Sequence, residues 1–147
     1  MGGGPGIERG VTRTVVLDNE AVRALMDVEH RKHRRALSFV QVAAARKRKA
    51  VAIALEVPTA VRVEAGWDRT APGAAFINLL RIRDAVLDTT SADVAAALRA
   101  TLAVSVADAH IGALVRARAG LGPVTVVSSD PNDMRAVADD DVTVVRL

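Results

Sequence analysis

The 147-residue chain is half apolar and carries a formal net charge of +3, a combination that excludes an intrinsically disordered protein. It has no cysteine, which excludes a disulfide framework, a zinc–thiolate site and a thiol nucleophile. No run of about 20 apolar residues could cross a bilayer, and residues 1–10 lack the features of a secretion signal, so we expect a soluble, cytoplasmic protein.

The order of apolar runs and turn residues predicts one α/β domain. Residues 1–10, with five glycines and one proline, predict a flexible tail before a single domain at 11–147. Short apolar runs predict strands at residues 14–17, 51–55, 85–87, 125–127 and 142–146. Apolar residues at helical spacing predict helices at 21–27, 29–48, 59–65 (with Thr59 as N-cap), 74–81, 91–101, 105–119 and 131–138. Because strands and helices alternate, we expect a mainly parallel sheet covered on both faces.

Basic charge is concentrated between residues 30 and 49. This stretch holds eight lysines and arginines and no acid, whereas the rest of the chain is net acidic. Such a basic helix can hold phosphates, and the candidate contacts are Arg31, Arg34, Arg35, Arg46 and Arg48. The alternative is a solvated helix that keeps the protein soluble. The chain has no tyrosine and only 2% aromatic residues, which argues against a surface that stacks bases.

Four acidic residues are candidates for a shared site. Asp18 and Asp130 follow the first and fourth predicted strands, and ligands of parallel sheets bind at such strand ends. Glu64 and Asp108 lie on predicted helices, and the spacing of the four matches no local metal-binding motif, so only the fold could assemble them. Each has an alternative role: Asp18 and Asp130 can cap helices, Asp108 with Ser105 resembles a capping box, and Glu64 can be a surface residue.

Other catalytic chemistry has little support in the sequence. His30, His33 and His110 lack the spacing of zinc ligands, and the chain has neither a phosphate-binding glycine loop nor a serine-hydrolase motif. We expect His110 to pack in the core or lie at the surface, with support of nearby Asp108 as the alternative.

Four segments occur in a recognisable order along the chain. They are Val15-Val16-Leu17-Asp18, Val57-Pro58-Thr59 followed by Glu64, residues 105–113 around Asp108, and residues 126–134 around Asp130. Each segment alone is a weak signal, but the four together, with the right elements between them, resemble the PIN domain, the fold of VapC-type ribonuclease toxins. The resemblance covers nearly the whole chain after the glycine-rich tail.

The resemblance implies a three-layer α/β/α sandwich with a five-stranded sheet in the order 3-2-1-4-5. It also implies an acidic pocket made of Asp18, Glu64, Asp108 and Asp130, with Asp133 at its edge and Ser128 in support. Asn19 stands where the family usually has a smaller residue, and its amide can bond a carboxylate or a metal-bound water. Neighbouring carboxylates repel one another, and Mg²⁺ or Mn²⁺ relieves this because hard cations favour carboxylate oxygens.

We therefore expect a Mg²⁺-dependent endoribonuclease that acts as the toxin of a type II toxin–antitoxin system. The resemblance implies RNA as substrate, a cognate antitoxin as partner, and a homodimer. Two alternatives remain open. One is a PIN nuclease of RNA processing without an antitoxin, and the other is a non-catalytic α/β binding or regulatory module with a degenerate site.

Overall fold

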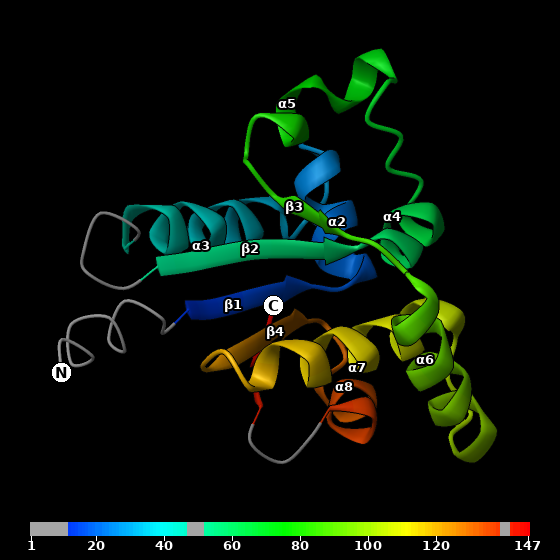
Figure 1. The fold of residues 1–147 in the computed structure, drawn as a ribbon. Coiled ribbons are helices and arrows are strands. Elements are labelled where there is room, and N and C mark those ends of the chain that lie inside the picture. Colours follow the sequence, from blue (N-terminus) through cyan, green and yellow to red (C-terminus); the bar gives the residue numbers. More distant parts are fainter. Residues whose placement is uncertain (1–11, 47–51, 139–141) are drawn as a thin grey trace, which may run out of the picture.

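Five strands and seven α-helices make up the computed structural model, which describes residues 12–46, 52–138 and 142–147 (Figure 1). The strands are β1 Thr12–Leu17, β2 Ala52–Pro58, β3 Arg83–Ala85, β4 Val124–Ser128 and β5 Thr143–Arg146. The helices are α2 Asn19–Met26, α3 His33–Arg46, α4 Thr59–Ala65, α5 Ala75–Asn78, α6 Thr89–Thr101, α7 Val106–Ala119 and α8 Pro131–Val137; a 3-10 turn, Pro72–Ala74, precedes α5. The expected tail at residues 1–10 lies outside the described residues.

The sheet has the order β3-β2-β1-β4-β5, and every neighbouring pair is parallel, as expected. Its interior strands are apolar runs, because a parallel sheet is buried on both faces. Val16, Val57 and Val126, one from each of the three interior strands, are completely buried. The carboxyl ends of β1 and β4 therefore lie side by side in the middle of one sheet edge, where ligands of such folds bind.

Helices cover both faces of the sheet, which makes the three-layer sandwich that was expected. Side chains alternate between the two faces along a strand. Ile53 and Leu55 of β2 line a cavity together with residues of α3, so α3 covers their face. Glu56 belongs to the opposite face, where Arg118 of α7 donates two hydrogen bonds of 2.8 Å to its carboxylate. Figure 1 shows α3 and α7 on opposite sides of β1 and β2.

The basic segment is divided between a turn and a helix, whereas one helix from residue 29 was expected. Asp27 accepts a hydrogen bond from the Glu29 amide at 2.9 Å, and the His33 amide donates to the His30 carbonyl. These local bonds hold residues 27–32 in a turn, and α3 begins only at His33. Arg31 and Lys32 therefore precede the helix instead of lying on it.

Two further boundaries differ from the expectation near β3. This strand spans Arg83–Ala85, not residues 85–87, because the Leu87 amide donates to the Thr59 hydroxyl at 3.2 Å and leaves the sheet. Thr59 is consequently the first helical residue of α4, and Pro58 takes the N-cap position without a side-chain bond. The helix expected at 74–81 is limited to α5, and Arg81 beyond it has a φ of +58°.

The turn before β4 requires glycine at one position. Gly122 has a φ of +149°, and a Cβ built there would lie 2.3 Å from the backbone oxygen of Thr12 in β1. Both the conformation and the close approach exclude any side chain at this position.

No helix among the described residues is long and apolar enough to span a membrane.

Candidate active site

Asp18 lies at the carboxyl end of β1, the central strand, and is 6% exposed. Its Oδ1 accepts a hydrogen bond of 2.8 Å from the Ala21 amide, so the expected helix cap is confirmed. Burial raises the pKa of Asp18, and hydrogen bonds from the Ser128 side chain and from the backbone of Ala21 and Ser129 oppose this rise. Ser128 ends β4, so its hydroxyl reaches the Asp18 carboxylate from the neighbouring strand.

Asp108 lies in the first turn of α7 and is half-buried. The Ser105 hydroxyl accepts the Asp108 amide at 3.1 Å, which confirms the helix cap at this position. Burial raises the pKa of Asp108 to about 6, and the negative charges of Glu64, Asp133 and Asp18 add to the rise. These charges come from α4, α8 and the end of β1, so the fold brings acidic residues from four separate segments to one place. We call Asp18, Glu64, Asp108 and Asp133 the acidic cluster.

Asp130 and Asp133 form a pair at the start of α8. Asp130 caps this helix, since its Oδ1 accepts the Asp133 amide at 3.3 Å, and the Ser128 hydroxyl accepts the Asp130 amide at 2.9 Å. A hydrogen bond with Asp130, and the charge of Asp130, raise the pKa of Asp133. Asp133 acts directly on Asp108, whereas Asp130 acts on Asp133, so Asp130 is connected to the acidic cluster through its neighbour on α8.

His110 ties the helix of Asp108 to the helix of Glu64. Its ring is 1% exposed, which confirms the expected packing role, and Nδ1 accepts the Ala60 amide of α4 at 3.3 Å. An accepting Nδ1 places the ring proton on Nε2, and burial lowers the pKa of His110, so the imidazole is neutral. A backbone hydrogen bond with Val86 engages the ring as well. One buried side chain therefore sets how α4 and α7 meet.

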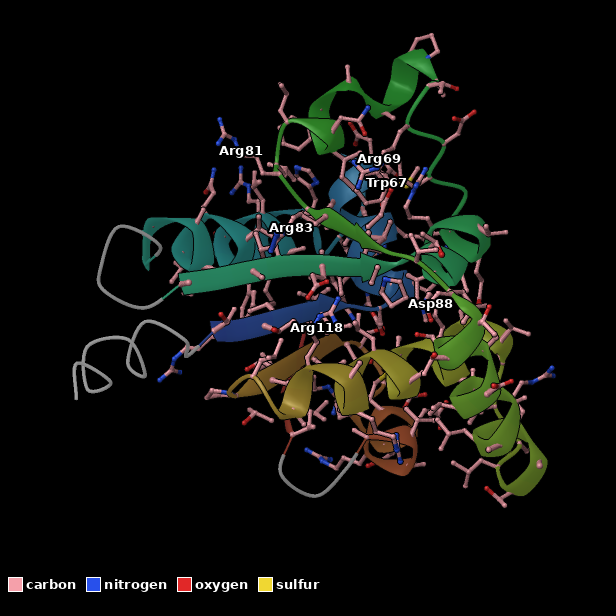
Figure 2. All side chains as sticks on the ribbon, viewed as in Figure 1. Trp67, Arg69, Arg81, Arg83, Asp88 and Arg118 are labelled. Atoms are coloured by element: carbon pink, nitrogen blue, oxygen red, sulfur yellow. The ribbon has the colours of Figure 1, made fainter. Side chains whose placement is uncertain are left out.

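The segment that follows Glu64 is held by a second cluster (Figure 2). Trp67 is 2% exposed, and its Nε1 donates to the Asn78 side chain at 3.0 Å. The Arg69 guanidinium lies over the indole, 4.2 Å from the ring centroid, and pairs with Asp84 of β3 at 2.8 Å. Because these contacts join the end of α4 to the edge strand, they limit the movement of the Glu64 backbone.

Asn19 carries an unexplained acceptor directly after Asp18. Its Oδ1 is buried and has no hydrogen-bond partner in the described part of the protein. A buried acceptor of this kind normally has a partner, so its position calls for a water or an ion. We expected the Asn19 amide to bond a carboxylate or a metal-bound water, and an unpartnered oxygen fits the second role.

The acidic cluster is not a finished coordination sphere. Within residues 12–46, 52–138 and 142–147, no three side chains of His, Cys, Asp or Glu are arranged to hold a metal ion as they stand. The donors are nevertheless all oxygens, which suits Mg²⁺ or Mn²⁺ and disfavours softer metals.

The basic residues lie in three different settings. Arg31 is exposed in the turn before α3, and Arg34 and Arg35 are exposed in the first turn of that helix. Arg46 is the last residue of α3, and Arg48 lies outside the described residues. The structure adds Arg146 at the carboxyl end of β5, which lines two cavities with Arg31 and was not predicted. In the sequence, Arg146 is a basic residue at the end of a predicted strand, and only acidic residues at strand ends were predicted to be functional.

No protein-family model and no curated protein matches the sequence. Among solved structures, the chain is similar to a chain in the crystal structure of VapBC2 from Rickettsia felis, in which VapBC2 is bound to a DNA fragment from its promoter. The TM-score is 0.59 at 10% sequence identity, over 90% of this chain and 98% of the other. At this identity the likeness concerns the fold, and the fold of the protein is that of a VapBC component.

Proposed function

We propose that the protein is a metal-dependent nuclease that hydrolyses RNA, the toxin of a VapBC-type toxin–antitoxin pair. The observation that carries the proposal is that the half-buried Asp108 lies within the electrostatic reach of Glu64, Asp133 and Asp18; burial raises its pKa to about 6, and these three charges add to the rise. Like charges held close together lower the stability of the folded state, so their proximity here indicates a binding role. A divalent cation at this place would offset the repulsion.

The residues suited to hold Mg²⁺ or Mn²⁺ are Asp18, Glu64, Asp108 and Asp133. When bound, the ion supplies a Lewis acid that polarises a phosphodiester and lowers the pKa of a water molecule. Ser128 orients Asp18 from β4, and the buried Oδ1 of the next residue, Asn19, has no hydrogen-bond partner in the described part of the protein. Asp130 orients Asp133 by capping α8.

The protein itself sets the pH range in which the cluster can take up a cation. Because the pKa of Asp108 is about 6, this side chain holds a proton in mildly acidic solution and is ionised at neutral pH. A protonated carboxyl is a poor ligand for a hard cation, so binding should weaken as the pH falls through 6. Burial lowers the pKa of His110, and its ring nitrogen accepts the Ala60 amide, which links α7 to α4.

An antitoxin and a second copy of the chain are further parts of the proposal. The fold shared with a VapBC2 chain supports them, and so do exposed apolar side chains near the acidic cluster. Val63 lies beside Glu64 on α4 and is 82% exposed, and Val86, whose backbone forms a hydrogen bond with His110, is 65% exposed. A protein partner would remove such side chains from water, which is favourable.

RNA cleavage tests the proposal directly. The purified protein is incubated with end-labelled RNA in Mg²⁺, in Mn²⁺ and in EDTA, and Asp108→Asn and Glu64→Gln serve as inactive controls. We expect cleavage by the wild type with either metal, and none in EDTA or by the variants. Expression should arrest bacterial growth, and the Asp108→Asn protein should not.

Cleavage that persists in EDTA, or in Asp108→Asn, would show that the acidic cluster is not the catalytic centre. Intact RNA, together with a melting temperature that no divalent metal changes, would favour the non-catalytic binding module. Cleavage without growth arrest would favour a nuclease of RNA processing.

A further inference from the structure

Two adjoining cavities lie beside the acidic cluster and share three basic residues, Arg31, Lys32 and Arg146. The larger, of about 640 Å³, is also lined by Glu20, His30 and Ser129. The smaller, of about 360 Å³, is also lined by Arg35 and Leu147. We call the two together the basic cleft. It is built from the turn before α3, the start of α3 and the end of β5.

Within the part of the chain that the structure describes, the cations of the basic cleft are not neutralised by acidic side chains. In the described residues no carboxylate pairs with Arg31, Lys32, Arg35 or Arg146. Arg62, Arg69 and Arg118 differ, because each forms an ion pair with a carboxylate. Glu20, the one acidic side chain among the residues that line the cleft, is hydrogen-bonded to His30. The cleft therefore keeps a strong positive potential, which attracts an anionic ligand.

The sheet register places the basic cleft next to the acidic cluster. Ser128 supports Asp18 on one side, and on the other side it is the register partner of Arg146 in β5. Strands are about 4.8 Å apart, so two spacings put the backbones of Asp18 and Arg146 about 10 Å from each other. Glu20 and Ser129, which line the cleft, follow Asp18 and Ser128 closely in the chain. The cleft and the cluster thus lie next to each other at the carboxyl ends of the strands.

We propose that the basic cleft binds the phosphodiester backbone of a single-stranded nucleic acid and leads it to the acidic cluster. The proposal deepens the nuclease function above, on which it rests. A negatively charged cluster repels a polynucleotide, and neighbouring cations overcome that repulsion. A phosphate bound in either cavity would contact both the segment at residues 30–35 and the end of β5, which suits a single strand because its backbone is exposed on several sides. None of the three aromatic residues, Phe39, Trp67 and Phe76, lines them, so the bases are not held by stacking.

Binding through phosphates has two measurable properties. It depends little on base sequence, and the logarithm of the binding constant falls with the logarithm of salt concentration, by about 0.7 for each neutralised phosphate of a single strand. Removing one arginine of the basic cleft should reduce this slope by about 0.7. It should also weaken binding about tenfold, as expected for one charge-assisted hydrogen bond.

The experiment measures fluorescence anisotropy of labelled oligo(U) and oligo(dT) with the full chain in EDTA, over a range of salt concentrations. Arg31→Gln and Arg146→Gln test the cleft. Arg83→Gln is the matched control, because it removes the same charge from an arginine that is also exposed and lies on β3, the strand at the other side of the sheet from β5 (Figure 2). We expect the stated losses in the first two variants and a change below about twofold in the control. Equal melting temperatures confirm that all variants are folded.

Unchanged binding in Arg31→Gln and Arg146→Gln, or an equal loss in Arg83→Gln, would overturn the proposal. So would polyglutamate that competes as well as the oligonucleotides, because the cleft would then suit an acidic polypeptide. A preference between oligo(U) and oligo(dT) identifies RNA or DNA as the source of the phosphates, and either supports the cleft. Because EDTA prevents metal-dependent cleavage, the two proposals fail separately. If the cleft variants lose binding and the wild type leaves RNA intact in Mg²⁺, the cleft is supported and the nuclease function is rejected. If the wild type cleaves RNA and the cleft variants bind as tightly as the wild type, the nuclease function is supported and the cleft is rejected.

Discussion

Replacing Asp108 with Asn should stabilise the protein in the absence of metal. The substitution keeps the shape of the side chain and removes its charge. The pKa of Asp108 is raised from 3.8 to about 6, and each unit corresponds to about 1.4 kcal/mol, so ionised Asp108 costs the folded state up to about 3 kcal/mol. The charge also interacts favourably with the N-terminus of α7, which is worth about 0.3–1 kcal/mol. Solvent screening of this half-buried group reduces the cost further. We therefore expect a net gain of about 1–2 kcal/mol.

The gain has a defined pH dependence. A carboxyl whose pKa is higher in the folded state binds more protons when folded, so wild-type stability falls as the pH rises between about 4 and 6. The difference between Asp108→Asn and the wild type should be small at pH 4, grow up to about pH 6 and remain constant above it.

Thermal and urea unfolding in EDTA measure this difference, at several pH values between 4 and 8. At pH 8 a gain of this size raises the melting temperature by about 3 to 8 °C for a chain of this length. Adding Mg²⁺ should raise the stability of the wild type and leave Asp108→Asn almost unchanged, because a ligand that binds only the folded state stabilises it. A variant that is less stable than the wild type at pH 8, or a difference that does not vary with pH, would refute the electrostatic interpretation of the acidic cluster.

Four further predictions concern the candidate site and the contacts that hold the fold. Asp18→Ala should cost about 1 kcal/mol more in urea unfolding than Asp18→Asn, because only Asn retains a helix cap, and neither should bind Mg²⁺. Arg118→Met should cost about 3–5 kcal/mol by leaving Glu56 buried and unpaired, and adding Glu56→Met should recover most of that stability. His110→Leu should cost about 1–3 kcal/mol and weaken stabilisation by Mg²⁺, because the Ala60 amide loses its acceptor. Gly122→Ala should lower the melting temperature, since the added carbon would meet the Thr12 oxygen, and an unchanged value would refute the close approach.

Much of the fold could be predicted from the sequence because local patterns carry the information. Apolar β-branched runs specified the strands near residues 14–17 and 125–127, and capping residues specified the starts of α7 and α8. The sheet order followed from the resemblance of four short segments, and the structure confirms it. The expected capping roles of Asp18 and Asp130 are confirmed as well, and they coexist with a place in or beside the acidic cluster.

Boundaries that depend on contacts between distant segments could not be read from the chain. Thr59 is a residue type that is common at N-caps, but its hydroxyl accepts the Leu87 amide 28 residues away. Because of this bond, β3 ends before residue 87, where the strand was expected to end. The turn at residues 27–32 interrupts a stretch whose apolar spacing continues as a helix, because hydrogen bonds of Asp27 and His30 outweigh helical propensity there.

The sequence by itself determined which residue types were available: several carboxylates, a basic segment, no thiol and few aromatic side chains. Only the tertiary structure decided which of them meet. Asp108 is exposed to the charges of Glu64, Asp133 and Asp18 because a parallel sheet brings the carboxyl ends of its strands and the starts of the following helices to one edge. The same edge places Arg146 beside Arg31, although 114 residues separate them in the chain. The positions of these two arginines along the chain do not predict that they lie close together, because their proximity arises from strand order and register.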